Sequence, residues 1–313
     1  MNRGNTTAKV FCAAAISFAA HGQFLIAQQR QAAAPARHTQ IVLLGTGNPA
    51  ADPDRSGPAT AIVVNSTPYL VDFGPGVVRR AAAAARDRGI NALQPINLRV
   101  VFATHLHSDH TVGFPDLIFS PWTLGRRVPL EVYGPKGIKA MAEHLQEAYK
   151  VDIDARTNAE ASQREIPEGH KVNAHEIGAG VVYKDDNVTV TAFPTKHAVE
   201  SYGYRFDTSD RSVVISGDTN PTQAMIDACH GCDVLIHDGM PLSSLENFPP
   251  VFQAFAGKYH TTTAQLAELA AKAKPHLLII YHVGAGDSGE RVLREMLERY
   301  PGHVVVGRDL DIY

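Results

Sequence analysis

Short apolar runs alternate with longer amphipathic stretches along most of the chain, which predicts alternating strands and helices. Strands are predicted at residues 40–44, 60–64, 68–73, 98–103, 130–133, 188–193, 202–206, 212–216, 233–236, 277–281 and 303–306. Helices are predicted at residues 77–88, around Asp116, at 136–149, 261–273 and 288–299, and before Cys229. Residues 151–176 are polar and lack apolar periodicity, so they predict an extended connection or lid.

The pattern differs at the N-terminus, where residues 10–20 form one apolar stretch behind the basic Arg3 and Lys9. This stretch is too short to span a bilayer, and small residues that suit cleavage follow it. We therefore predict a signal peptide at residues 1–27, a flexible leader at 28–39 and a single folded domain at 40–313. The mature protein would be periplasmic or secreted and would have no membrane segment. An apolar but disordered tail is the alternative.

Composition and charge narrow the class of protein. Hydrophobic residues make up 44% and charged residues 19% of the 313 residues, which is ordinary for a soluble globular enzyme and excludes a disordered or fibrous chain. The formal charge is −3, and loss of Arg3 and Lys9 with the signal peptide would make it −5. No basic run is present, so no nucleic-acid partner is expected.

A glycine-rich segment, Gly45-Thr46-Gly47-Asn48-Pro49-Ala50, follows the first predicted strand. It formally matches a dinucleotide-binding pattern, but Pro49 and the polar residues after it leave no helix to hold a pyrophosphate. We instead predict a turn at the rim of a site. Arg55 in this region could meet an anionic substrate or could be a solvated loop residue.

Cys229 and Cys232 form one Cys-x-x-Cys motif. Without a second pair, this motif is a weak zinc signal. We favour a structural role, and an oxidising compartment would allow a disulfide between them.

Metal-binding chemistry is concentrated in Thr104-His105-Leu106-His107-Ser108-Asp109-His110. Three imidazoles and a carboxylate would be costly to bury together unless a cation neutralised and ordered them. The i, i+2 spacing of His105 and His107 places both rings on one side of an extended segment. Asp109 and His110 come after the chain has turned, so they reach a different point. This geometry predicts two metal ions.

Further candidates each follow the C-terminal end of a predicted strand. Because sheets gather chemistry at one edge, residues far apart in sequence can converge there. Those in this position are His105, His197, Asp218, Asp238 and His282. Asp72 ends another strand, where it could orient a ligand histidine or simply form a turn.

The ordered motifs resemble the ligand series of the metallo-β-lactamase superfamily, and the resemblance covers essentially the whole chain after residue 40. They are His105-Leu106-His107-Ser108-Asp109-His110, His197, Asp218 within Ser216-Gly217-Asp218-Thr219, and His282. The resemblance implies a four-layer αββα sandwich of two mixed β-sheets flanked by helices, and often a homodimer. It also implies two zinc ions, which manganese or iron could replace. His105, His107 and His197 would hold one ion, and Asp109, His110 and His282 the second, with Asp218 bridging.

Further motifs resemble the branch that contains ribonuclease Z and secreted arylsulfatases. They are Leu44-Gly45-Thr46-Gly47, Tyr69-Leu70-Val71-Asp72-Phe73-Gly74, Leu130-Glu131-Val132-Tyr133-Gly134-Pro135 and His260-Thr261-Thr262. In ribonuclease Z a glutamate pairs with the histidine that matches His260, whereas this chain has the shorter Asp238. A typical ribonuclease Z also has a basic, Gly/Pro-rich tRNA-binding arm where this chain has the acidic, glycine-poor residues 151–168. Together with export and negative charge, this difference favours the arylsulfatase-like branch.

The resulting hypothesis is a zinc-dependent hydrolase that cleaves a small, anionic sulfate ester with a hydroxide held between the metal ions. His260, oriented by Asp238, would donate a proton to the leaving group, and Asp109 is counted with them as catalytic. A helix-cap role is the alternative for His260. Other functions considered are a phosphodiesterase, including a ribonuclease Z-like endonuclease, and a lactonase or β-lactamase. The complete ligand series argues against a metal-binding scaffold protein.

Overall fold

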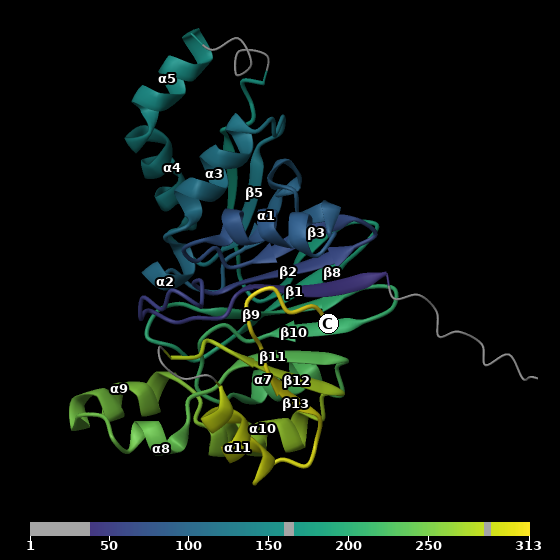
Figure 1. Ribbon diagram of the computed structural model, residues 1–313, viewed down its shortest axis with the longest axis vertical. Coiled ribbons are helices and arrows are strands. Elements are labelled where there is room, and N and C mark those ends of the chain that lie inside the picture. The colour runs from purple at the N-terminus through teal and green to yellow at the C-terminus, as the bar shows by residue number, and fades with distance from the viewer. Residues whose placement is uncertain (1–37, 160–165, 285–288) are drawn as a thin grey trace, which may run out of the picture. The chain divides into compact units, whose positions relative to one another are not determined.

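Two mixed β-sheets form the centre of the structure, a computed structural model that describes residues 38–159, 166–284 and 289–313 (Figure 1). These described residues belong to one compact unit, Arg37–Tyr313. The six strands of the first sheet lie in chain order: β1 (Thr39–Gly45), β2 (Ala59–Val64), β3 (Thr67–Val71), β4 (Val100–Phe102), β5 (Leu130–Gly134) and β6 (Val172–Glu176). The seven strands of the second sheet lie in the order β13 (Val304–Val306), β12 (Leu277–Tyr281), β11 (Val234–Asp238), β10 (Ser212–Ile215), β9 (Tyr202–Asp207), β8 (Thr189–Pro194) and β7 (Gly180–Lys184).

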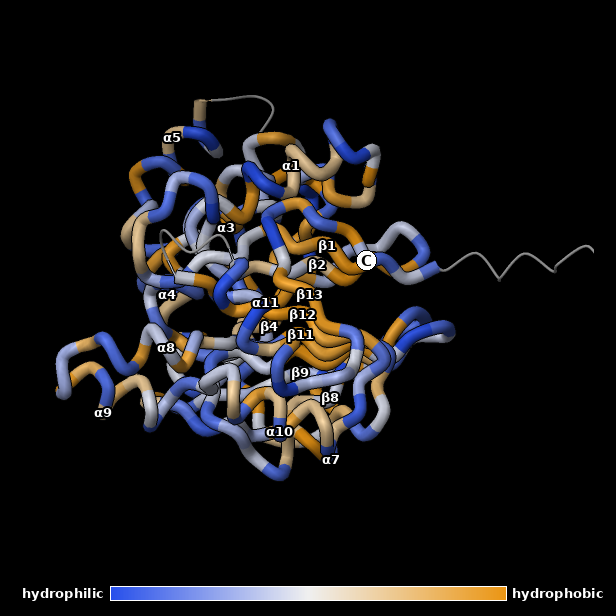
Figure 2. Tube along the Cα trace, turned by 60° about the horizontal axis from the view of Figure 1, so that its bottom comes forward, coloured by the Kyte–Doolittle hydropathy of each residue, from blue (hydrophilic) through white to orange (hydrophobic). Residues whose placement is uncertain are grey.

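Alternation along the strands explains why the sheets pack face to face. In β1, Ile41 and Leu43 point into the core between the two sheets, whereas Val42 and Leu44 point outward to a second core under the helices. Ile279 of β12 likewise joins the core between the sheets, while its neighbours face a third core. Both faces of these strands are therefore apolar, as the orange strands β11 to β13 in Figure 2 illustrate.

Helices cover both outer faces. The core outside the first sheet includes residues of α1 (Val77–Asp87), α3 (Phe114–Thr123) and α4 (Ile138–Ala148). The core outside the second sheet includes residues of α7 (Gln223–Cys229), α10 (Thr263–Ala273) and α11 (Glu290–Leu297). The predicted αββα sandwich of two mixed sheets flanked by helices is confirmed.

The prediction of an extended connection over residues 151–176 is wrong. This region contains α5 (Lys150–Ala159) and strand β6, which pairs in parallel with β5. None of the residues of α5 is buried, and β6 is an edge strand whose residues are exposed or half-buried. Neither element therefore needs the apolar periodicity by which such elements are recognised in a sequence.

Four further elements, one strand and three helices, were not predicted. Strand β7 lies at the edge of the second sheet. Helices α8 (Leu242–Leu245) and α9 (Pro250–Tyr259) lie between β11 and α10, where no helix was expected. A single turn of helix, α2 (Ser108–Thr111), holds the second half of the histidine-rich loop.

The predicted signal peptide and leader fall almost entirely outside the described residues, which begin at His38. Among the helices that the structure describes, none is both long enough and apolar enough to cross a membrane. Cys229 and Cys232 form a disulfide with a sulfur–sulfur distance of 2.07 Å, and both residues are buried. The Cys-x-x-Cys motif is therefore part of the core outside the second sheet.

The strand ends that carry polar residues meet at one edge of the sandwich. β8, β10, β11 and β12 run in the same direction, so the residues that follow them emerge together. Gly217, before Asp218, has φ +62°, and a Cβ there would lie 2.7 Å from Thr104 Cβ. Glycine thus lets the loop after β10 approach the loop after β4 closely. Asp72 and His282 also have positive φ, at 62° and 59°.

Candidate metal centre

The seven predicted metal ligands lie together at this edge, although they are spread over 178 positions from His105 to His282. They come from the loop after β4, the turn α2 and the ends of β8, β10 and β12. Potential ligand atoms of these seven residues form two groups, within each of which they lie within 4.8 Å of one another. One group is His105, His107 and His197, and the other is Asp109, His110, Asp218 and His282. These are the two groups that the resemblance implied, with Asp218 assigned to the second.

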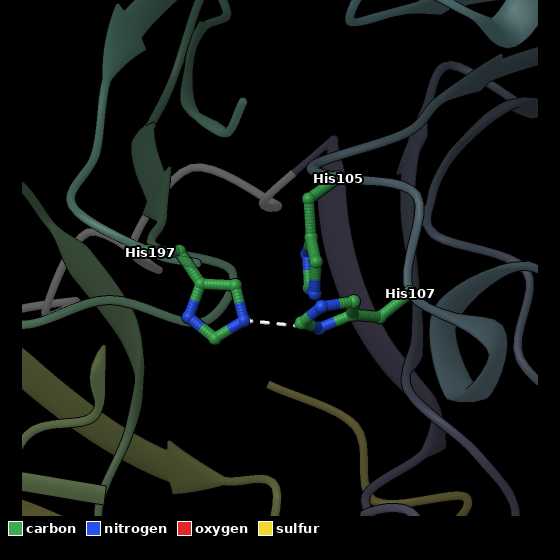
Figure 3. A group of neighbouring side chains, drawn as sticks. All are labelled: His105, His107 and His197. Carbon is green, nitrogen blue, oxygen red and sulfur yellow. Dashed lines mark hydrogen bonds between the residues drawn. The ribbon is translucent and has the colours of Figure 1, made fainter. Parts of the chain in front are cut away.

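The first group consists of three imidazole rings that converge on one point (Figure 3). His107 Nδ1 and His197 Nε2 lie 3.0 Å apart. His105 is completely buried, and its ring centroid lies 4.7 Å from that of His107 and 4.7 Å from that of His197. Three ring nitrogens that face one another without a polar neighbour between them form a suitable site for one divalent metal ion.

Hydrogen bonds behind the rings select the tautomers. The Thr104 hydroxyl donates to Asp72 Oδ2, so it can only accept at the 3.0 Å contact with His105 Nδ1. His105 Nδ1 is therefore the protonated nitrogen, and Nε2 presents a lone pair to the site. His197 Nδ1 similarly donates to the carbonyl oxygen of Tyr259 at 3.0 Å, which leaves its Nε2 as an acceptor. Such bonds orient histidines for metal binding.

The second group combines two carboxylates with two imidazoles. His282 Nε2 lies 3.3 Å from Asp109 Oδ2 and 3.3 Å from Asp218 Oδ2. His110 Nε2 lies 3.3 Å from Asp218 Oδ1, while its Nδ1 contacts Asp72 Oδ2 at 2.9 Å. Asp72 thus supports His110 directly and His105 through Thr104, which is the orienting position that the sequence suggested.

Asp218 lies between the two groups. Its side chain is 3% exposed; Oδ2 lies 4.0 Å from His105 Nε2 in the first group, and Oδ1 lies 3.3 Å from His110 Nε2 in the second. A carboxylate can offer one oxygen to each of two cations. Asp218 therefore has the geometry of a bridging ligand.

Burial and charge have opposite effects on the histidines of the two groups. Burial lowers the pKa of His105, His107 and His197, which favours the neutral imidazoles that bind metals. Burial also acts to lower the pKa of His110, but the Asp218 and Asp72 carboxylates outweigh it and raise that pKa well above its usual range. The negative charge that holds a proton on His110 would equally hold a divalent cation.

Unsatisfied polar atoms support occupation of this site by metal. Among the described residues, His105 Nε2, His110 Nε2 and Asp218 Oδ1 are buried and make no hydrogen bond. Buried polar atoms without partners are costly, and all three point into the cluster. The donor set of imidazoles and carboxylates suits zinc or a similar divalent ion. The residues therefore fit a divalent metal centre.

His260 and Asp238 lie beside the cluster. His260 Nδ1 lies 3.2 Å from Asp238 Oδ2, so the shorter aspartate does reach the histidine. Burial acts to lower the pKa of His260, but the hydrogen bond to Asp238 and the charges of Asp218 and Asp238 outweigh it and raise that pKa. A third group of potential ligand atoms, from His197, Asp218 and His260, makes metal binding the competing role for His260.

A cavity of about 620 Å³ opens onto the centre. Its inner wall includes His107, Asp109, Asp218, His260 and His282, and its outer wall includes three phenylalanines of the α8–α9 region. Asn48 and Pro49 also line it, so the glycine-rich turn does lie at the rim.

Arg55 makes hydrogen bonds within the protein, so it is not the freely solvated loop residue that the sequence also allowed. Its Nη1 donates to Thr46 Oγ1 at 2.8 Å and to the carbonyl oxygen of Gly307 at 3.0 Å. These bonds tie the rim loop to the C-terminal segment.

The family profile described as the beta-lactamase superfamily domain matches residues 67–283, a span that contains all seven predicted ligands. The chain belongs to the metallo-β-lactamase superfamily. A relative in Mycobacterium bovis (strain BCG / Pasteur 1173P2) named Ribonuclease Z is 32% identical over 279 residues, which cover 87% of this chain and 96% of the relative. This member of the superfamily is therefore a metal-dependent hydrolase, as predicted.

Solved structures show the same metallo-β-lactamase fold. A metallo-β-lactamase fold protein from Bacillus subtilis has a TM-score of 0.67 at 15% identity and covers 88% of this chain and 99% of its own. The short form of human tRNase Z has a TM-score of 0.65 at 18% identity and covers 88% and 98%.

The prediction of a sulfate ester as substrate is wrong, because the curated relatives are named for a ribonuclease and match the alternative that we had placed second. The expectation that no nucleic acid is involved is contradicted by the same relatives. Both errors have one physical cause. Net charge and a missing basic arm describe how tightly a surface holds RNA, whereas the metal motifs carry the chemistry and do not distinguish one anionic ester from another.

Proposed function

We propose that this metallo-β-lactamase superfamily member is a ribonuclease Z-like phosphodiesterase that cleaves RNA. The observation that supports it most is the match over 279 residues with curated ribonuclease Z relatives. The chain covers 96% of the first of these relatives, so the match extends well beyond the metal motifs.

The site residues have the chemistry that this reaction needs. Divalent cations held by the two groups would supply positive charge to the phosphoryl oxygens and activate water. His105, His107 and His197 would hold one cation, and Asp109, His110 and His282 the other, with Asp218 shared. We propose zinc for both, because the first group is made of imidazole nitrogens alone. Asp72 keeps His105 and His110 oriented through the hydrogen bonds described above.

His260 is the proposed proton donor. Its Nδ1–H donates to Asp238, which leaves Nε2 to carry the proton that the departing oxygen receives. The raised pKa of His260 supports this role, because a protonated imidazole is the form that can act as an acid. His260 also lines the cavity, and its Nδ1 lies 4.0 Å from Oδ2 of the proposed shared ligand Asp218, so a leaving group in the cavity could reach the ring.

Cleavage of matched polymers tests the proposal. The protein would be loaded with zinc, analysed for metal content and incubated with a structured RNA that carries a single-stranded extension, with the same strand in DNA, and with bis(p-nitrophenyl) phosphate. We expect cleavage of the RNA, and we expect His105→Ala to abolish it together with binding of one zinc. Intact RNA in the presence of two bound metals would contradict the proposed function.

A further inference from the structure

An aromatic wall borders the cavity on the side away from the sheets. It consists of Phe248, Phe252 and Phe255, which line the cavity and are 38%, 42% and 40% exposed. Phe252 and Phe255 belong to α9, whereas Phe248 lies in the turn just before this helix, and all three side chains line the cavity. Three partly exposed phenylalanines gathered on one cavity wall are unusual unless a ligand or partner covers them.

The wall leads directly to the reaction centre. Ring centroids are 4.7 Å apart for Phe248 and Phe252, and 6.3 Å apart for Phe252 and Phe255. Phe255 lies 6.2 Å from the ring of His260, which lies 5.9 Å from the ring of His282. A group held on the wall would therefore be attached close to the bond that reacts.

Hydrogen bonds hold the chain on both sides of the wall. Before it, at the start of α8, Glu295 of α11 accepts hydrogen bonds from the backbone N–H groups of Leu242 and Ser243. After it, at the end of α9, the carbonyl oxygen of Tyr259 accepts a hydrogen bond from the metal-centre residue His197. Both Figures 1 and 2 place α8 and α9 side by side. A surface that is already ordered loses little entropy when it binds a flat ring.

The charges around the wall suit an anionic chain. Among the described residues, the carboxylates that line the cavity belong to the metal centre or to the His260 pair, namely Asp109, Asp218 and Asp238. The outer lining is neutral apart from Arg291, whose Nη1 donates to Ser244 Oγ at 2.8 Å. No described residue of this outer lining carries a negative charge, and the volume of about 620 Å³ is in the range of small-molecule sites.

We propose that Phe248, Phe252 and Phe255 form a stacking platform for an unpaired base of the RNA next to the bond that is cut, which rests on the proposed function. Stacking on phenylalanine holds single-stranded RNA without requiring a particular base, because every base has an aromatic face. The platform would therefore add affinity for RNA that the net charge of −3 does not supply.

Equilibrium binding tests the platform separately from cleavage. Fluorescence anisotropy would measure the affinity of zinc-loaded protein for a labelled single-stranded RNA with non-hydrolysable phosphorothioate linkages. The same RNA would also be made with abasic nucleotides at successive positions. We expect Phe252→Ala and Phe255→Ala each to weaken binding roughly 5- to 100-fold. Val251→Ala, on the same helix but 80% exposed and outside the cavity lining, is the matched control and should bind like wild type.

Two further comparisons separate stacking from simple apolar contact and from a fold defect. Phe252→Tyr should restore affinity, whereas Phe252→Leu should not. One abasic position should weaken binding by the wild-type protein about as much as Phe255→Ala weakens binding of the intact RNA. The same abasic position should weaken binding by the Phe255→Ala protein little further.

Three outcomes would overturn the platform: equal affinities for wild type and both alanine variants, equal affinities for intact and abasic RNA, or no binding of RNA by wild type. A wild-type dimer that Phe252→Ala converts to a monomer with unchanged RNA affinity would instead assign the wall to self-association. Cleavage by the wild-type protein, measured separately, decides the proposed function.

Discussion

His260 Nδ1 lies 3.2 Å from Asp238 Oδ2, and this contact joins the end of α9 to the last residue of β11 across 22 positions of sequence. Asp238 is 2% exposed and His260 is 15% exposed, so the pair is a buried carboxylate that supports a histidine at the cavity wall. This relationship distinguishes a helix-cap histidine, which needs no carboxylate behind it, from one that is prepared to carry a proton.

His260→Ala should lower kcat for RNA cleavage by about 100- to 10,000-fold with zinc content unchanged, because the leaving oxygen would lose its proton donor. Asp238→Asn should lower kcat less, and the double variant should lose little beyond His260→Ala, because the two residues act as one unit. The control is His276→Ala, at an exposed position. Loss of zinc in His260→Ala would instead make His260 a metal ligand, and unchanged turnover would exclude both roles.

Asp72→Asn should weaken zinc binding roughly 10- to 100-fold, because the carboxylate accepts hydrogen bonds from Thr104 and orients His110. Asparagine tolerates the positive φ of 62° at this position, so the backbone should keep its conformation. Calorimetric titration of metal-free protein with zinc would measure the change. Asp116→Asn is the control, since Asp116 pairs with Arg79 and Ser120 outside the centre. Equal affinities in wild type and Asp72→Asn would contradict the orienting role.

Protonation of Glu295 at low pH should destabilise the start of the α8–α9 region. Burial acts to raise the pKa of Glu295, but hydrogen bonds from Ser243, Thr263 and the backbone N–H of Leu242 outweigh it and lower that pKa from its ordinary value of 4.5. Because the pKa is lower in the folded state, Glu295 takes up a proton at a higher pH in the unfolded chain than in the folded one. The stabilisation is therefore present above pH 4.5 and is lost as the pH falls through the folded-state pKa.

Glu295→Gln should accordingly unfold at lower urea concentration than wild type at neutral pH, and its stability should fall less steeply below pH 4.5. Urea titrations followed by circular dichroism over this pH range would measure both effects. Glu298→Gln, on an exposed neighbour in the same part of the chain, is the control. Parallel pH profiles for wild type and Glu295→Gln would show that this carboxylate does not contribute.

Export stays a prediction from the sequence. If residues 1–27 are a signal peptide, the protein recovered from the periplasm or medium of expressing cells should lack them, and intact mass spectrometry would show the new N-terminus. Replacement of apolar residues within 10–20 by charged ones should leave the full-length chain in the cytoplasm. A full-length chain from the unmodified sequence would contradict the prediction.

The fold and the candidate ligands could be predicted from the sequence because the ordered motifs resemble the ligand series of the metallo-β-lactamase superfamily. Imidazoles and carboxylates as dense as those of residues 105–110 have few uses other than metal binding. The resemblance implied stacked sheets between helices, and strands with two apolar faces fit that fold because both faces need cover. Asp218 and His282 were identified because each follows a strand end.

The partners of these residues depended on tertiary structure. The hydrogen bond from Thr104 to Asp72 joins segments 32 positions apart, and no local pattern encodes it. The contact of Asp238 with His260, across 22 positions, was expected only from the family resemblance. The sequence does not single out Phe248, Phe252 and Phe255 either, because it does not distinguish a phenylalanine that fills a core from one that lines a cavity.

The substrate class could not be predicted from whole-chain charge. Net charge reports the average field around a molecule, whereas recognition depends on the few groups that face the reacting bond. A metal site is indicated by the types of residue that can bind metal, so the sequence was enough to identify the candidate ligands. The walls of a cavity are set by how distant elements pack, and only the folded chain reveals them.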